Sequence, residues 1–384
     1  MYYSEFIQND VLNCIWLDVA EKRMGVAPQS TSLFSYCDRR SLNSILMLVS
    51  LLRRLLLSDK RNHLCPQKLL IIQLIWILPY VLVTNYLERS LLAFRLACYT
   101  QSDLLSHTPY ATDTEQCVQR LFSGQRSTKE ACSLKEDVDL ILTPRLPSHS
   151  FDTVIVVRSA PKASDYRNYI RRTWAKDAKG YAPVVFAVAK GADLSKEAKE
   201  HGDIMQFDYP DSYYSLSKKM TMTYRWFLTL PTSITKLVVT NDDVVLHVQN
   251  LKEMDLPPLY DTWVVGKVSR GYPRLIFPWI TWYVSGDSYP HMCYPRFVQG
   301  SSMVFSRSAV KEIYDGVCSI PLLPLDDVLM GVQSLCLPFE QVHREGFDVH
   351  WPNEYFVVFH HQYERYDWKR LETLYNATAG KTRR

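Results

Sequence analysis

The chain has 384 residues, of which 47% are hydrophobic and 12% aromatic, enough for one large domain or two ordinary ones with additions. This composition excludes a disordered chain. Its 44 basic and 40 acidic residues leave a net charge of only +4, so the sequence carries no general basic surface for nucleic acid.

An apolar run over residues 69–87 predicts a membrane-spanning helix. A helix of this length extends about 28 Å, close to the roughly 30 Å of a bilayer core. Gln73 and Pro79 interrupt the run, although membrane helices tolerate proline, and the alternative is a buried amphipathic helix. Basic residues are more numerous before the run than after it, which predicts that residues 1–68 form a cytosolic tail and that the rest is luminal.

The polar, weakly patterned residues 88–150 indicate a stem before a domain at residues 151–384. Six of the nine cysteines follow the predicted span, where a lumen would permit disulfides whose pairing the sequence does not reveal: Cys98, Cys117, Cys132, Cys293, Cys318 and Cys336. There is no C-x-x-C pair in the sequence to support a zinc site. Asn376-Ala377-Thr378 is a glycosylation sequon, accessible only if this end is luminal.

From residue 151 the chain alternates strand-like and helix-like segments, which predicts an α/β domain. The predicted strands are Val154–Val157, Val184–Ala189, Leu237–Val239 and Trp263–Lys267. The predicted helices begin near Arg167, Leu194, Leu216, Arg307 and Asp326. The run at 237–239 is typical of a strand buried on both faces, as in parallel sheets covered by helices.

Two carboxylates, Asp242 and Asp243, follow Asn241 where this strand ends. Ligands of parallel sheets bind beyond the carboxyl ends of the strands. Adjacent carboxylates repel each other unless a cation joins them to a polyanion, and Mg²⁺ or Mn²⁺ prefers carboxylate and phosphate oxygen. The stretch therefore indicates a metal and phosphate site, with a solvated turn between two strands as the alternative.

A second acidic pair, Asp326 and Asp327, opens a later helix. Between the pairs lies a segment rich in Pro, Tyr and Trp, at residues 279–295. Aromatic faces with a few directed carboxylates commonly bind sugars, so this arrangement favours a carbohydrate over a protein substrate. The alternative for Asp327 is an N-cap at the start of its helix.

Five ordered blocks are similar to known patterns: R-x-x-I-R-x-T-W at Arg167–Trp174, D-D-D-V at Asn241–Val244, W-Y-V…Y-P…Y-P-x-Y-x-x-G at Trp282–Gly300, and E-D-V-x-x-G at Asp326–Gly331. The fifth is D-F-x-D-x-Y-x-N-L-T-x-K with R-W, which the chain matches at Asp208, Asp211, Tyr213, Leu216, Lys219, Arg225 and Trp226. Together they resemble glycosyltransferase family 31, the β-1,3-galactosyltransferases and β-1,3-N-acetylglucosaminyltransferases. The resemblance runs from about Val154 to the C-terminal region.

The resemblance implies a single-pass type II Golgi membrane protein with a signal-anchor helix and a luminal catalytic domain. That domain would have the GT-A fold, in which a mostly parallel sheet carries helices on both faces. The implied reaction is inverting, uses Mn²⁺, and moves galactose or an N-acetylhexosamine from a UDP-sugar to a glycan hydroxyl. A β-1,3 linkage on a glycoprotein or glycolipid would result.

The resemblance also implies roles for single residues. Asp243 and His360, chosen over His361, would bind the metal, and Asp327 would be the base that deprotonates the acceptor hydroxyl. The nucleotide sugar would be held by Asp242 with Arg167, Arg171, Lys219 and Asn241.

The chain departs from the family pattern at four positions, with Asn241 in place of Asp, Val239 of Lys, Ser215 of Asn and Val298 of Cys. Asn241 keeps an acceptor but loses a charge, which we expect to weaken metal or ribose binding. A second hypothesis is therefore a degenerate relative that binds carbohydrate or stabilises a partner without turnover. The retained Asp242, Asp243 and Asp327 favour the active enzyme.

Overall fold

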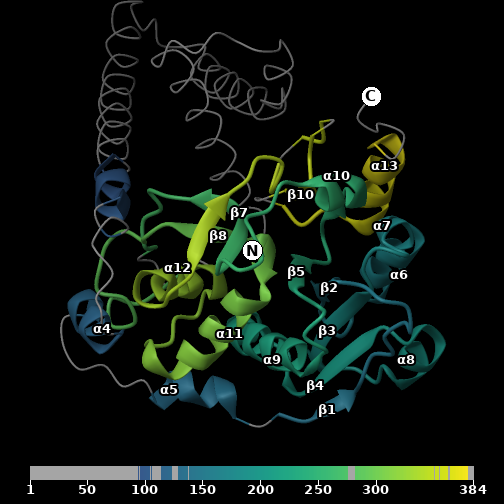
Figure 1. The fold of residues 1–384 in the computed structure, drawn as a ribbon, viewed down its shortest axis with the longest axis horizontal. Coiled ribbons are helices and arrows are strands. Elements are labelled where there is room, and N and C mark those ends of the chain that lie inside the picture. Colours follow the sequence, from purple (N-terminus) through teal and green to yellow (C-terminus); the bar gives the residue numbers. More distant parts are fainter. Residues whose placement is uncertain are drawn as a thin grey trace, which may run out of the picture. The chain divides into compact units, whose positions relative to one another are not determined.

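The computed structural model describes residues 94, 96–103, 105, 114–122, 129–136, 138–275, 282–349, 351–353, 355–361 and 364–378 (Figure 1). These residues all fall within one unit, Glu88–Arg384. The predicted span at 69–87 and the tail before it lie outside the described residues. Within the described part, no helix has the length and apolar character needed to cross a bilayer.

A mixed sheet forms the centre of the fold. Its strands are β1 (Leu140–Leu142), β2 (Thr153–Arg158), β3 (Val184–Lys190), β4 (Ile204–Pro210), β5 (Lys236–Asn241), β7 (Trp263–Ser269), β8 (Phe297–Ser306) and β9 (Glu340–His343). They lie in the order β1-β4-β3-β2-β5-β8-β7-β9. The block from β4 to β5 is parallel, as are β7 and β9, whereas β1 and β8 run antiparallel to their neighbours.

The four predicted strands are present as β2, β3, β5 and β7, each longer than expected at one or both ends. The sheet is buried on both faces because alternate side chains of its strands enter two separate clusters. Ile155, Val157 and Val238 pack into one cluster, and Val154 with Val239 packs into the other. The burial on both faces that the β-branched run predicted is confirmed.

Helices cover both faces of the sheet. They are α4 (Thr114–Phe122), α5 (Lys129–Cys132), α6 (Ser164–Arg172), α7 (Trp174–Asp177), α8 (Ser195–His201), α9 (Leu216–Thr229), α10 (Val248–Glu253), α11 (Arg307–Gly316), α12 (Asp326–Cys336) and α13 (Trp368–Thr378), with 3-10 turns η2 (Ser133–Lys135), η3 (Tyr213–Ser215) and η4 (Val317–Ser319). Tyr169 of α6 and Leu371 of α13 pack on one face, and Met220 of α9 and Val310 of α11 on the other. The predicted α/β class is confirmed (Figure 1).

Segments predicted as stem are joined to the sheet. Strand β1 pairs with β4, so the sheet begins before residue 151. Three disulfides connect the same region to later elements: Cys98–Cys293, Cys117–Cys336 and Cys132–Cys318. These are the six cysteines that follow the predicted span, and such bonds persist in oxidising compartments.

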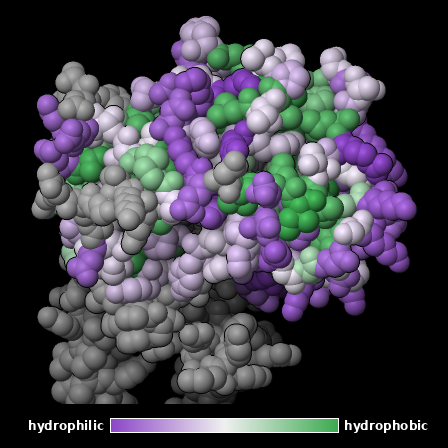
Figure 2. Space-filling view, turned by 90° about the horizontal axis from the view of Figure 1, so that it is seen from below, coloured by the Kyte–Doolittle hydropathy of each residue, from purple (hydrophilic) through white to green (hydrophobic). Residues whose placement is uncertain are grey.

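The surface does not separate into an apolar face and a polar face in the view of Figure 2. Hydrophobic and hydrophilic residues are interspersed there, which is ordinary for a folded domain, since apolar atoms supply much of any protein surface. The candidate site is therefore sought from the placement of its side chains rather than from a patch.

A candidate active site at the carboxyl edge of the sheet

Two strand ends and a helix start meet at one edge of the sheet. Strands β2 and β5 are parallel neighbours, and their last residues, Arg158 and Asn241, lie opposite each other in the register. Because β8 is antiparallel to β5, its first half reaches the same edge at Gly300. Helix α12 begins there with Asp326. The two acidic pairs are thus brought to one edge, as the sequence hypothesis required.

Arg158 connects these elements, and the sequence analysis did not identify it. The residue is only 6% exposed. Its guanidinium donates to Asn241 Oδ1 at 2.7 Å, to the carbonyl oxygen of Gly300 and to the carboxylate of Asp326. One buried cation therefore joins β2, β5, β8 and α12, and it fixes the acidic pair of α12 relative to the end of β5.

A short two-stranded sheet places His360 beside Asp243. Strand β6 (Val245–Leu246) begins two residues after Asp243, and β10 (Val358–Phe359) ends just before His360. The strands pair antiparallel with Val245 opposite Phe359. As a result, His360 Nε2 lies 3.8 Å from Asp243 Oδ1.

The other ring nitrogen of His360 is held from behind. His360 Nδ1 lies 2.9 Å from Asp348 Oδ1, an arrangement that directs Nε2 toward Asp243. Asp348 itself is buried and adopts a left-handed backbone with φ of 53°. Burial lowers the pKa of His360, but the hydrogen bond to Asp348 and the charge of Asp243 outweigh burial and leave that pKa raised.

This donor set fits a hard divalent cation. Asp243 Oδ1 is buried and makes no hydrogen bond within the described part of the chain, so a ligand position is open. A carboxylate oxygen and an oriented imidazole suit Mn²⁺, with phosphate oxygens to complete the coordination. The residues that the structure describes hold no group of three or more His, Cys, Asp or Glu able to bind a metal by themselves. His361, the alternative ligand, stacks on Tyr366 with ring centroids 4.5 Å apart.

Asp242 is 2% exposed and is held by two donors. Its Oδ2 accepts a hydrogen bond from Ser159 Oγ at 2.9 Å, and its Oδ1 accepts one from Arg365 Nη2 at 2.5 Å. Burial raises the pKa of the Asp242 carboxyl, and the charge of Arg365 opposes that rise only in part. Arg365 was not predicted from the sequence.

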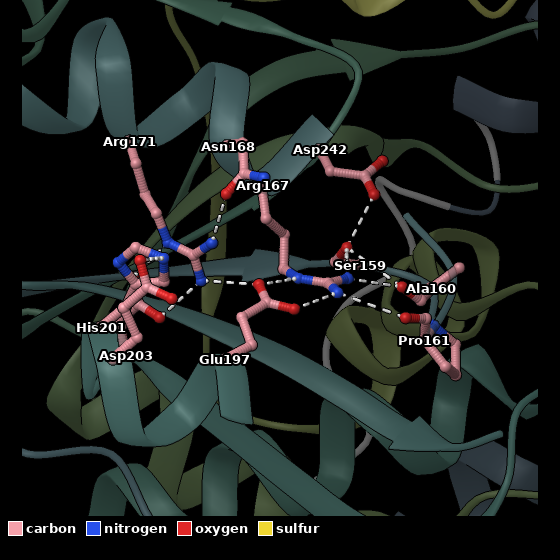
Figure 3. Close-up of polar contacts among 11 residues, drawn as sticks. Ser159, Ala160, Pro161, Arg167, Asn168, Arg171, Glu197, His201, Asp203 and Asp242 are labelled. Atoms are coloured by element: carbon pink, nitrogen blue, oxygen red, sulfur yellow. Dashed lines mark hydrogen bonds and ion pairs between the residues drawn. The ribbon is translucent and has the colours of Figure 1, made fainter. Parts of the chain in front are cut away.

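The predicted nucleotide residue Arg167 lies behind the loop that follows β2 (Figure 3). It is fully buried and donates to Glu197, to Ser159 Oγ and to the carbonyl oxygens of Ala160 and Pro161. These contacts occupy all of its donors, so Arg167 reaches Asp242 only through Ser159. In this position it supports the loop beneath the carboxylate pair.

Arg171 and Lys219 are also engaged with the protein. Arg171 pairs with Asp203 at 2.7 Å and with Glu197 at 2.8 Å (Figure 3). Lys219 is buried, and its Nζ donates to the carbonyl oxygen of Ser159 at 3.1 Å and to Asp211 at 2.9 Å. Burial lowers the pKa of Lys219 against the opposing charge of Asp211. Lys219 therefore supports the loop after β2, whereas Arg171 joins α6 to α8 and to the residue before β4.

Asp327 is positioned by two backbone amides. Its Oδ2 accepts from Gly300 N at 3.2 Å and its Oδ1 from Val328 N at 2.8 Å. Position 300 is a glycine where a Cβ would lie 3.3 Å from Asp327 Oδ2, so a side chain there would crowd the carboxylate. The N-cap alternative is wrong, because α12 begins at Asp326 and the cap position is Leu325.

The environment of Asp327 suits a general base. Burial, assisted by the charge of Asp326, raises the pKa of Asp327 to about 7, although the two amides and Arg158 favour its ionised form. A base is most effective when its pKa lies near the working pH. The carboxylate can therefore both take and release a proton near neutrality.

Exposed aromatic rings lie near this base. Burial and the charges of Asp326 and Asp327 raise the pKa of Tyr213 to about 12, with a hydrogen bond to Trp282 acting in the opposite direction. Tyr213 and Trp282 are nonetheless 43% and 48% exposed, so their rings are accessible to a ligand. Tyr289 of the same segment is buried and serves the core.

Known proteins resemble part of this chain. The family model described as Galactosyltransferase matches residues 165–344. Beta-1,3-galactosyltransferase 5 of Gorilla gorilla gorilla is 28% identical over 225 residues, which cover 55% of this chain and 76% of that protein. The lactosylceramide 1,3-N-acetyl-beta-D-glucosaminyltransferase of Homo sapiens is 29% identical over 199 residues, covering 47% of this chain and 52% of that protein. Among solved structures, the galactosyltransferase LgtC with donor and acceptor sugar analogues matches 59% of this chain and 99% of its own, with 11% identity and a TM-score of 0.35.

Proposed function

Because these matches confirm the resemblance to glycosyltransferase family 31, we propose that this chain is an inverting β-1,3-hexosyltransferase. Its donor would be UDP-galactose or a UDP-N-acetylhexosamine, and its acceptor a hydroxyl of a glycan on a glycoprotein or glycolipid. One observation carries the proposal: the acidic pairs at 242–243 and 326–327 lie at the carboxyl edge of one sheet, where Arg158 bonds Asp326 and also Asn241, the residue before the first pair. One pair would serve the donor and the other the acceptor.

Each pair has features suited to its side of the reaction. Bound at Asp243 and His360, Mn²⁺ would neutralise charge on the departing diphosphate. Ser159 orients the Asp242 carboxylate through a hydrogen bond that is already present without a donor. Asp327 would orient the acceptor hydroxyl and accept its proton.

In the reaction, the hydroxyl oxygen of the acceptor forms a bond to the anomeric carbon while the bond from that carbon to the diphosphate oxygen breaks. The hydroxyl proton passes to Asp327, and UDP leaves with the bonding electron pair. Attack from the side opposite the diphosphate inverts the anomeric centre. The exposed rings of Tyr213 and Trp282, close to Asp327, would bind the acceptor sugar by stacking.

The proposal includes the GT-A fold, a place in the Golgi lumen and the predicted divisions at 68 and 87, whereas β1 lies before the predicted division at 150 and belongs to the central sheet. A parallel block from β4 to β5, with ligand residues at its carboxyl edge, supports the fold. The three disulfides support an oxidising compartment for the described part of the chain. The membrane span itself is inferred from the sequence.

The competing function is carbohydrate binding or partner stabilisation without turnover. It was motivated by Asn241, but in the structure the oxygen of Asn241 accepts a hydrogen bond from Arg158. Asp242, Asp243 and Asp327 all remain in place. An active enzyme is therefore the better-supported function.

UDP release from a panel of UDP-sugars with Mn²⁺ and acceptor glycans tests the proposal. We expect release with one donor, and a fall of two or more decades in Asp327→Asn, since general base catalysis contributes about 10² to 10⁴ in rate. UDP affinity should stay unchanged in this variant. Asp315→Asn is the control, because Asp315 is exposed on α11 and its carboxylate pairs with Lys311 one turn away in the contacts of the described residues.

The outcomes separate the two functions. Binding of UDP without release by the wild-type protein would favour the degenerate relative. Turnover above about a tenth of wild type in Asp327→Asn would remove Asp327 as the base and leave Asp326 as the remaining candidate.

A further inference from the structure

Arg365 is placed on both carboxylates of the proposed donor site. Its Nη2 lies 2.5 Å from Asp242 Oδ1, and its Nη1 lies 3.5 Å from Asp243 Oδ2. The guanidinium carbon is 4.4 Å from the centre of the Tyr166 ring. A single side chain from the segment after β10 thus contacts the residue that holds the nucleotide and the residue that binds the metal.

The exposure of Arg365 distinguishes it from the other arginines of the site. Arg158 and Arg167 are buried, and both bind backbone carbonyls that fix one element to another. The Arg365 side chain is 49% exposed, and in the described part of the chain it contacts the site carboxylates and Tyr166. Such a guanidinium is reachable by a ligand from solvent.

The backbone next to Arg365 is held in place at Tyr366. Tyr166 of α6 donates its hydroxyl to the carbonyl oxygen of Tyr366 at 2.9 Å. Tyr366 itself is buried in the core. The backbone is therefore held at the mouth of the site, while the side chain at 365 can turn between partners that lie near each other.

The charges in the site determine whether Arg365 pairs with the carboxylates of Asp242 and Asp243 or with a bound diphosphate. A divalent cation at Asp243 Oδ1 and a guanidinium near Asp243 Oδ2 repel each other and compete for the charge of the same carboxylate. A diphosphate bound to that cation supplies new anionic oxygens beside the displaced guanidinium. Arginine binds phosphate through two parallel N–H donors, so it fits this acceptor better than a point charge does.

We propose that Arg365 is a binding residue for the diphosphate of the donor and that it competes with the divalent cation for Asp242 and Asp243. This inference rests on the proposed function. It makes opposite predictions for two ligands: removal of the side chain strengthens binding of the metal alone and weakens binding of UDP with the metal. A purely structural role would weaken both.

Calorimetric titration of Arg365→Ala with MnCl₂ alone, with UDP in saturating Mn²⁺ and with UMP in saturating Mn²⁺ provides the test. We expect tighter Mn²⁺ binding, and UDP affinity reduced about tenfold or more, as for the loss of a hydrogen bond to a charged group. UMP should lose less than UDP. Arg365→Lys should retain part of the UDP affinity, because it keeps the charge without the fork.

Arg370→Ala is the matched control. Arg370 lies on α13 with its guanidinium carbon 3.6 Å from the Tyr366 ring centre. The variant therefore removes a cation that lies close to Arg365 in the sequence. This variant should bind Mn²⁺ and UDP as wild type does. An equal change in Arg370→Ala would attribute the effect to general charge near the site and overturn the assignment.

The possible failures are distinguishable. If wild-type protein binds neither Mn²⁺ nor UDP, the proposed function falls and the inference falls with it. If wild type binds both and Arg365→Ala is unchanged, or loses Mn²⁺ and UDP affinity together, only the role of Arg365 is rejected. An equal loss of UMP and UDP affinity also rejects the role, because UMP lacks the second phosphate and the loss would then not depend on that group.

Discussion

Replacing Arg158 by glutamine is expected to destabilise the fold strongly, because the Asp326 carboxylate would lose its cation. The two side chains are only 5% and 10% exposed. Removing one partner of a buried ion pair costs about 3–5 kcal/mol. Asn241 and the carbonyl of Gly300 would lose a donor as well. Against a total stability of roughly 5–15 kcal/mol, the variant should fold but unfold at much lower denaturant concentration.

Equilibrium unfolding in urea, with linear extrapolation, measures this cost. The double variant Arg158→Gln/Asp326→Asn should recover much of the lost stability, because no buried charge is then left unpaired. The coupling between the two sites follows from the cycle of single and double variants.

Arg307→Gln is the control for this cycle. Arg307 bonds the carbonyls of Leu228, Leu230 and Ile234 at the opposite edge of the sheet and is not paired with a carboxylate in the contacts of the described residues. Its loss should cost roughly 1–3 kcal/mol and be additive with Asp326→Asn. The bridging role would be refuted if the stability losses of Arg158→Gln and Asp326→Asn were additive. It would also be refuted if Arg158→Gln alone cost less than about 1 kcal/mol.

Four further predictions concern the metal ligand, the proposed base and the C-terminal sequon. Mn²⁺ with UDP should stabilise the protein by about 2.7 kcal/mol at a hundredfold excess over the dissociation constant, and Asp243→Ala should remove that thermal shift; a retained shift would exclude Asp243 as a ligand. Because burial raises the pKa of Asp327 to about 7, UDP release should increase as pH rises through that value, and a flat profile would contradict the assignment. The native state also holds this proton longer than the unfolded chain, so stability should fall as pH rises from about 4 to 7, a dependence that Asp327→Asn should remove. Asn376 is exposed on α13, so a secreted form beginning near Glu88 should change mobility after glycosidase treatment, and unchanged mobility would argue against luminal placement.

The parts of the fold that the sequence predicted are those determined by local pattern. The run Leu237–Val239 is rich in β-branched residues and lies in the middle of the sheet, where both faces are buried. Helix α9 keeps its apolar residues at helical spacing and packs one face on the sheet. Strand β8 was missed because Gln299, Ser301 and Ser302 are polar yet buried at the point where the strand crosses the site.

The parts that could not be predicted depend on contacts between distant segments. Arg158 meets Asp326 across 168 positions, and Arg365 meets Asp242 across 123. Arg158 did leave a signal, since a charged residue closes a strand whose other residues are all buried and apolar or small. The pairing of β2 with β5 turns that residue toward Asn241, and this register is a property of the sheet rather than of either segment alone.

These contacts give Asn241 a role in the charge balance around Arg158. Arg158 is one buried cation, and Asp326 already pairs with it. An aspartate at 241 would add a second carboxylate to the same guanidinium, and the weaker neutralisation of Asp326 would raise the pKa of the nearby Asp327 further. We therefore expect Asn241→Asp to move the pH profile of UDP release to higher pH while Mn²⁺ affinity changes little. Tighter Mn²⁺ binding with an unmoved profile would instead show that Asn241 weakens the metal site, which is the expectation that the sequence alone supports.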